Sequence, residues 1–165
     1  MKPAFHTHTS LWDFSLARYR QPGVETLCLA LQDNHGANVN ILLWLDWLEQ
    51  EGLRLTDTRL RLAQAYIAPW HTEIVEPLRR MRQHIKRHYG TRNASIEASR
   101  DAIKVAELKA EQAVQTRLES LAVTWLNASE RTLVPPGANL AIYARLLDLP
   151  EEQEHELLRQ FSVKP

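Results

Sequence analysis

Residues 28–48 read CLALQDNHGANVNILLWLDWL, with a polar segment at residues 32–40 between two strongly apolar stretches. The apolar stretches predict two buried helices, so the polar segment is either the corner that joins them or a functional site. Gly36 favours a left-handed helix end, and Asn38 is a typical N-cap residue. These two residues predict a sharp corner between two core helices.

The helix after this corner, predicted at residues 39–51, is apolar around nearly its whole circumference. Its apolar side chains are Ile41, Leu42, Leu43, Trp44, Leu45, Trp47 and Leu48. A helix of this kind lies at the centre of a core. Before the corner, Ser10 and Asp13 predict the start of a first helix, and Pro22 suits the opening turn of a second. The segment before Gly52 therefore predicts three packed core helices.

The middle of the chain predicts a long helical hairpin. Pro69 is expected to interrupt the fourth helix, and Pro77 to kink or restart it. Residues 95–127 contain neither Gly nor Pro and are rich in Ala, Glu, Lys, Gln and Leu, so they predict one long helix whose Ala-rich first half is less buried. We expect residues 72–127 to form an antiparallel hairpin with its tip at residues 89–93.

Strand signals are weak, because only five glycines are present and no Asn-Gly or Asp-Gly pair joins alternating apolar runs. We therefore predict an all-α, single-domain helical bundle of about six to eight helices spanning residues 1–165. Its regions are a flexible N-terminus (1–9), motif-bearing core helices (10–52), a kinked helix with the long-helix hairpin (57–127) and short C-terminal helices (128–165).

The composition limits the classes of partner. Twenty Lys and Arg balance twenty Asp and Glu, so a nucleic acid or an anionic surface would have to be met by a local patch of charge. The single cysteine, Cys28, excludes an intrachain disulfide and suits an inert core thiol. Because no apolar run is long enough to cross a bilayer, we expect no membrane insertion and a cytoplasmic protein. The oligomeric state is left open.

The polar corner supplies four candidate ligand-binding residues: Tyr19, Gln32, Asp33 and Asn40. If the corner is open, they meet at the junction of the first three helices. Asp33 and His35 straddle a helix end, which does not fit the spacing of a helix-borne metal pair. We favour a structural corner, with a small-molecule or partner-binding cleft and a catalytic site as the alternatives. No catalytic residue is predicted.

A basic strip, RRMRQHIKRHYGTR at residues 79–92, is the strongest charge asymmetry in the chain. Its cations are Arg79, Arg80, Arg82, Lys86, Arg87 and Arg92, with no acidic residue among them. Leu78, Met81, Ile85 and Tyr89 are predicted to face inward, which leaves the cations on the outer faces of the hairpin. The strip is either an ordinary solvated face or a contact surface for RNA, the ribosome or an acidic protein.

No cofactor or metal is predicted. His84 and His88 have metal-compatible spacing on a helix, but no Glu lies between them and Lys and Arg surround them. A Gly-rich phosphate loop, a nucleophile elbow and a Cys-x-x-Cys pair are all absent from the sequence.

Residues 11–48, LWDFSLARYRQPGVETLCLALQDNHGANVNILLWLDWL, resemble a proteobacterial family known as domain of unknown function 2390. The pattern is W-x-F-S-L, then Y-x-x-P-G-V, C-L-x-L-Q-D and G-x-x-V-N-x-L-L. Its matching positions are Trp12, Phe14, Ser15, Tyr19, Pro22, Gly23, Gln32, Asp33, Gly36, Val39 and Asn40. The resemblance implies a bacterial, cytosolic helical protein and carries over no activity.

Two functional hypotheses follow. The first is a non-enzymatic binding or adaptor protein that contacts a protein partner, RNA or the ribosome through the basic strip. The second is a small-molecule-binding or enzymatic site at the polar corner.

Overall fold

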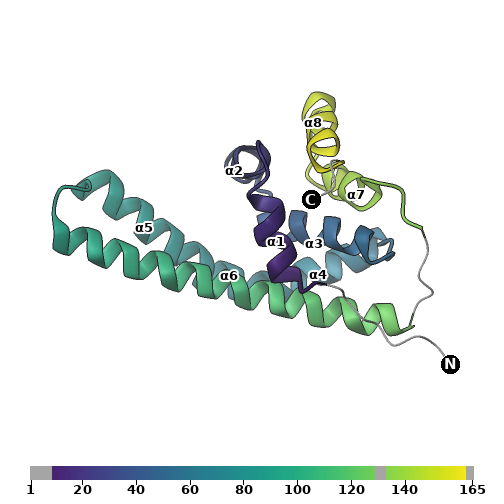
Figure 1. Ribbon diagram of the computed structural model, residues 1–165, viewed down its shortest axis with the longest axis horizontal. Helices are drawn as coiled ribbons and strands as arrows, with labels where there is room; N and C mark the ends of the chain where they lie inside the picture. The colour runs from purple at the N-terminus through teal and green to yellow at the C-terminus, as the bar shows by residue number, and fades with distance from the viewer. Residues whose placement is uncertain (1–8, 129–132, 163–165) are drawn as a thin grey trace.

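A computed structural model describes residues 9–128 and 133–162, and it confirms the predicted all-α fold (Figure 1). Its elements are α1 (Leu11–Tyr19), α2 (Val24–His35), α3 (Val39–Gln50), α4 (Asp57–Trp70), the π-helical turn η1 (His71–Val75), α5 (Glu76–Tyr89), α6 (Ala94–Ala128), α7 (Ala138–Leu146) and α8 (Glu151–Phe161). Because α4, η1 and α5 are continuous, the described ranges hold seven separate helical rods and no strand. Apart from Thr9, the predicted flexible N-terminus lies outside these ranges, as do positions 129–132 and 163–165 of the predicted C-terminal region.

The molecule consists of a body and an arm (Figure 1). The arm is α5 together with the N-terminal part of α6, and it projects from a body that contains the other helices and the rest of α6. Within the described residues, no helix is long and apolar enough to cross a membrane.

Helix α3 lies at the centre of the body, as its all-round apolar sequence predicts. Every residue from Ile41 to Leu48 is buried, and α3 packs on α1, α2, α6 and α7. The corner that leads into it also has the predicted form. Gly36 has a φ of 66°, and the Asn38 side-chain oxygen accepts the Asn40 amide hydrogen at a donor–acceptor distance of 3.0 Å. The corner therefore holds α2 and α3 at a fixed angle.

The prediction that Pro69 interrupts the fourth helix is wrong. Pro69 lies inside α4, and the helix continues through η1 into α5. In η1 the Glu76 amide donates to the His71 carbonyl, a bond across five residues that is typical of a π-turn. A proline ring clashes with the carbonyl four residues before it, and for Pro77 that carbonyl belongs to Glu73 inside η1. The wider π-turn therefore lies where it can keep the helix continuous into Pro77.

The predicted hairpin is confirmed, with its tip between Tyr89 and Ala94. The first half of α6 is less buried than the second, as expected: Val105 is 59% exposed, whereas Val114 is fully buried. The prediction that Met81 and Tyr89 face inward is wrong, since they are 53% and 60% exposed. Among the described helices, α5 packs mainly against α6 beyond its own rod, so no third helix covers these two side chains.

The body also buries one ion pair. Arg18 is fully buried, and its Nε donates to the Asp46 carboxylate at 2.6 Å, joining α1 to α3. The Arg18 guanidinium also lies over the rings of Phe14 and Phe161. Helix periodicity does not predict a buried cation at this position.

Candidate functional site

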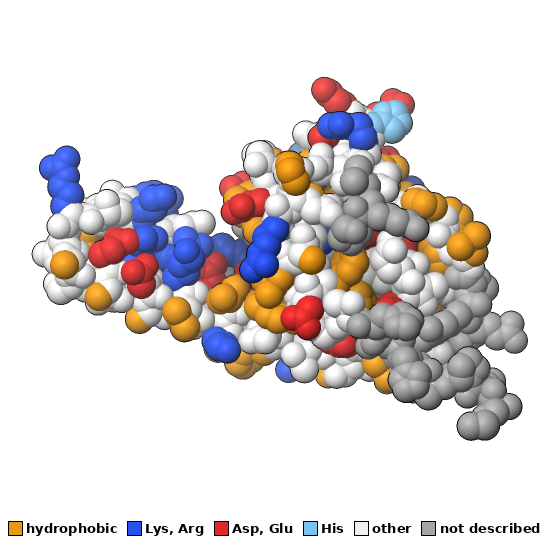
Figure 2. Space-filling view, viewed as in Figure 1, with side chains coloured by type: hydrophobic (Ala, Val, Ile, Leu, Met, Phe, Trp, Pro, Cys, Tyr) orange, Lys and Arg blue, Asp and Glu red, His pale blue; other side chains and the backbone are white. Residues whose placement is uncertain are grey.

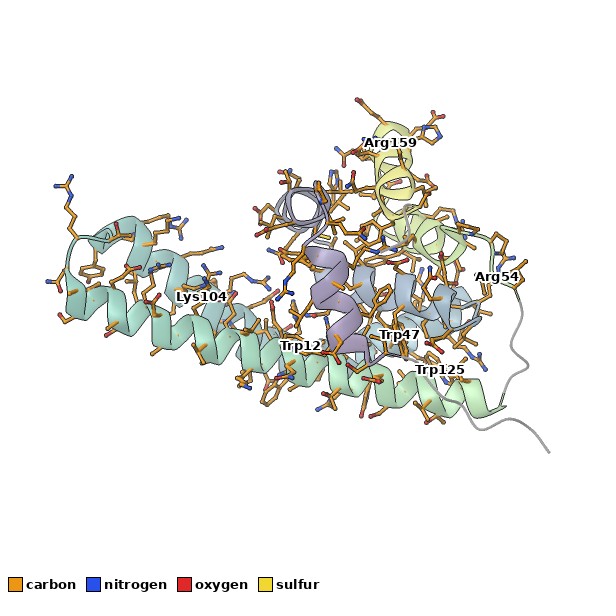
Figure 3. The ribbon with its side chains drawn as sticks, viewed as in Figure 1. Trp12, Trp47, Arg54, Lys104, Trp125 and Arg159 are labelled. Atoms are coloured by element: carbon orange, nitrogen blue, oxygen red, sulfur yellow. The ribbon has the colours of Figure 1, made fainter. Side chains whose placement is uncertain are left out.

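The surface is hollowed where the arm leaves the body, and the cleft has a volume of about 660 Å³ (Figure 2). Helix α1 lines it with Trp12, Ser15, Leu16 and Tyr19, whose spacing places them on one helical face. In Figure 3, Trp12 lies where α1 meets α6. The volume of the cleft is within the usual range for a small-molecule site.

Helices α2 and α3, which the polar corner joins, form a second wall of the cleft. Glu25, Leu29, Gln32 and Asp33 share one face of α2 and line this wall. Asn40 at the start of α3 extends the wall inward and is buried. All four candidate residues of the corner therefore line one cleft. The Asn38 side chain caps α3, but the side chains of Gln32 and Asp33 make no hydrogen bond to a backbone group within the described chain. The polar side chains of the corner are therefore not all used to cap helices, and those of Gln32 and Asp33 face the cleft.

The arm supplies the opposite wall. Arg79, Arg82, Gln83 and Lys86 line the cleft from α5, and they share one helical face. Helix α6 adds Lys104, Glu107, Leu108, Glu111 and Gln115. Lys and Arg atoms gather along the arm beside the hollow in Figure 2. Half of the predicted basic strip thus turns toward the candidate residues of the corner.

The other half of the strip does not join the cleft. Arg80, Arg87 and Arg92 are exposed and do not line it. The prediction that all six cations lie on the outer faces is therefore wrong for Arg79 and Arg82, which are bound by carboxylates of α6.

These carboxylates form a charged network at the base of the arm. Arg79 donates to Glu107 at 3.3 Å and to Glu111 at 2.7 Å, and Arg82 also donates to Glu107. The hydrogen bond that Arg82 donates to Glu107 is the largest cause of the raised pKa of Arg82. Burial raises the pKa of Glu111. The two arginines are therefore held in place by α6 before any ligand arrives.

Two buried polar atoms beside the cleft have no hydrogen-bond partner among the described residues: Ser15 Oγ and Gln115 Oε1. Both residues are only 3% exposed. The Gln115 amide nitrogen donates to the Asn40 side-chain oxygen at 3.0 Å, which fixes the orientation of the amide group. Because buried polar groups are nearly always satisfied, unsatisfied atoms at a cleft indicate a place where a ligand or water bonds.

Tyr19 contributes a phenol side chain to the cleft. Burial, the largest cause, raises its pKa to about 12, so it is a neutral donor or acceptor at any physiological pH. Within the described residues, no group of three or more His, Cys, Asp and Glu side chains is placed to hold a metal ion. A second concavity, of about 400 Å³, is lined by α8 alone, and a single helix does not enclose a ligand.

The sequence analysis did not identify the contribution of α6 to the cleft. Glu107, Glu111 and Gln115 recur every four residues, beside the apolar positions Ala110 and Val114. These three polar residues next to a buried apolar row could have indicated a partly buried polar face on α6. It was missed because the charges resemble an ordinary solvated helix face.

The fold and the cleft define a class: an all-α, single-domain protein with a hairpin arm and a mixed polar and apolar cleft at the base of that arm. Residues 10–118 match the model of one family, described as a protein of unknown function (DUF2390), and the chain belongs to that family. No significant match was found among curated proteins or among solved structures.

Proposed function

We propose that this chain is a non-enzymatic binding protein that takes a small ligand in the cleft between the body and the arm. One observation carries the proposal: the corner residues and the inward cations converge on a single cleft beside the unsatisfied atoms of Ser15 and Gln115. Binding fits this cleft better than catalysis does, because its arginines already bind carboxylates and no nucleophile is hydrogen-bonded to a base among the described residues that line it. A bacterial, cytoplasmic setting is part of the proposal.

A fragment screen by two-dimensional amide NMR on the intact protein tests this function. We expect hits whose shifts cluster on residues that line the cleft. Leu108→Trp should block them, because Leu108 lines the cleft and is 49% exposed, so a larger ring can enter it without disturbing the core. Val105→Trp is the matched control, since Val105 is exposed on the same helix but does not line the cleft. Hits that scatter over the surface, or that Leu108→Trp leaves unchanged, would overturn the proposal.

A second function is supported by the outer cations, Arg80, Arg87 and Arg92. Arg87 and Arg92 make no salt bridge within the described chain, and the nearest pairing of Arg80, with Glu76, is 3.8 Å long. Residues 76–111 hold nine Lys and Arg against five Asp and Glu, a net charge of +4. We propose that this surface contacts phosphates of RNA or the ribosome, with an acidic protein as the alternative partner.

A further inference from the structure

The two walls of the cleft carry opposite charges that the protein does not neutralise. On the α2 wall, Glu25 and Asp33 are exposed and make no salt bridge within the described residues. Asp33 lies in the last turn of α2, where the helix dipole disfavours an anion, so helix stability does not account for it. The α2 wall therefore presents two free carboxylates to the cleft.

The arm presents cations from the other side. Glu107 and Glu111 neutralise Arg79 and Arg82, but Lys86 and Lys104 make no salt bridge within the described chain. Both lysines are exposed, and Figure 3 shows Lys104 on the arm. The hydrogen bond from Arg100 is the largest cause of the lowered pKa of Glu97, and Lys86 adds only a smaller Coulombic effect on that paired carboxylate. The arm thus offers two ammonium groups for a ligand anion.

The cleft between these walls is largely apolar. Leu16, Leu29, Leu43 and Leu108 line it, together with the ring of Trp12. A ligand with charge at both ends and an apolar middle matches this order of surfaces. A purely anionic ligand would face the carboxylates of α2, and a purely cationic ligand would face the lysines of the arm.

We infer that the ligand is a zwitterionic small molecule with an apolar middle, its ammonium group toward Glu25 and Asp33 and its carboxylate toward Lys86 and Lys104. This inference rests on the proposed function of the cleft. The unsatisfied Ser15 Oγ and Gln115 Oε1 belong to residues that also line this cleft, and they offer hydrogen bonds to the polar groups of the ligand. The body and the arm thus bind the two ends of the ligand with side chains of opposite charge.

Straight-chain ω-amino acids of increasing length are the probes for this inference, titrated against the intact protein and followed by amide NMR. We expect affinity to peak at one length, at which the amino acid spans the two walls. The n-alkylamine and the n-alkanoate of that length lack one charge each, and both should bind at least tenfold more weakly.

Paired variants assign each charge to its wall. Glu25→Gln with Asp33→Asn should remove the preference for the amino acid over the alkanoate. Lys86→Gln with Lys104→Gln should remove its preference over the alkylamine. Arg87→Gln with Arg92→Gln is the control and should change neither preference, because these cations lie outside the cleft.

The outcomes separate the inference from the function on which it rests. If singly charged probes bind in the cleft as tightly as the amino acids, the zwitterion inference is overturned and the binding function stands. If neither these probes nor any fragment binds in the cleft, both are overturned. A length optimum with both losses of preference supports the inference.

Discussion

At the scale of single residues, Gly36 has a φ of 66°, in the left-handed region that a β-branched side chain disfavours. A Cβ at this position would meet no atom within 4 Å, so the strain comes from the backbone alone. We expect Gly36→Val to lower the free energy of unfolding by about 1–2 kcal/mol. Gly36→Asn should lower it less, because Asn tolerates this region. Urea denaturation measures the free energy of unfolding of both variants. If Gly36→Val is as stable as the wild type, the left-handed cap has no role in stability.

Removing Arg18 alone should destabilise the fold more than removing Arg18 and Asp46 together. Arg18→Met leaves the Asp46 carboxylate buried without its cation, and we expect a loss of about 3–5 kcal/mol. Arg18→Met with Asp46→Leu should recover most of this loss, because neither charge then has to be desolvated. Urea denaturation of the single and double variants measures the recovery. A double variant as unstable as the single one would show that the pair itself stabilises the fold.

The pH dependence of the same pair has a definite sign. Burial outweighs the attraction of Arg18 and raises the pKa of Asp46 from 3.8 to about 6. The folded state therefore binds this proton more tightly, so the contribution to stability is fully present below about pH 4 and is lost as the pH rises through about 6. Relative to the double variant, the wild type should lose stability between these pH values. A parallel pH profile of the two proteins would contradict the raised pKa.

At the scale of helices, Glu107 joins α5 to α6 through two arginines and is only 7% exposed. We expect Glu107→Gln to weaken the arm by about 1–3 kcal/mol, because hydrogen bonds to a charged group are lost in a partly buried place. Amide exchange should accelerate in α5 and stay unchanged in α3. Glu97→Gln is the control, since the salt bridge of Glu97 is made with Arg100 on its own helix. Equal exchange in the two variants would contradict a bracing role for Glu107.

At the scale of the whole molecule, the charge is segregated: the arm is basic although the chain is neutral. If the outer cations contact phosphates, Arg80, Arg87 and Arg92 changed together to Gln should lower the slope of log affinity against log salt by roughly two to three units. Binding to mixed RNA and to ribosomes across a salt series measures the slope, and circular dichroism checks that helicity survives. Wild-type protein that binds neither at low salt would show that this surface is only solvated.

The sequence by itself determined the helices and their ends. Gly36 ends α2 and Asn38 caps α3 as predicted, and the first half of α6 is less buried than the second, as its Ala-rich sequence predicts. These features depend on residues three or four positions apart along the chain, so local patterns are sufficient to predict them. Pro69 is the local exception, because α4 continues through it although a proline usually ends or interrupts a helix.

The tertiary structure alone decided the site. It turned one face of α2 and one face of α5 onto the same cleft, and it paired Arg79 and Arg82 with Glu107, more than twenty residues away. It also buried Arg18 against Asp46. Charges on a helix surface carry no local signal of their partner, because the partner depends on how the helices pack. The candidate residues were visible in the sequence, but their meeting in one cleft was not.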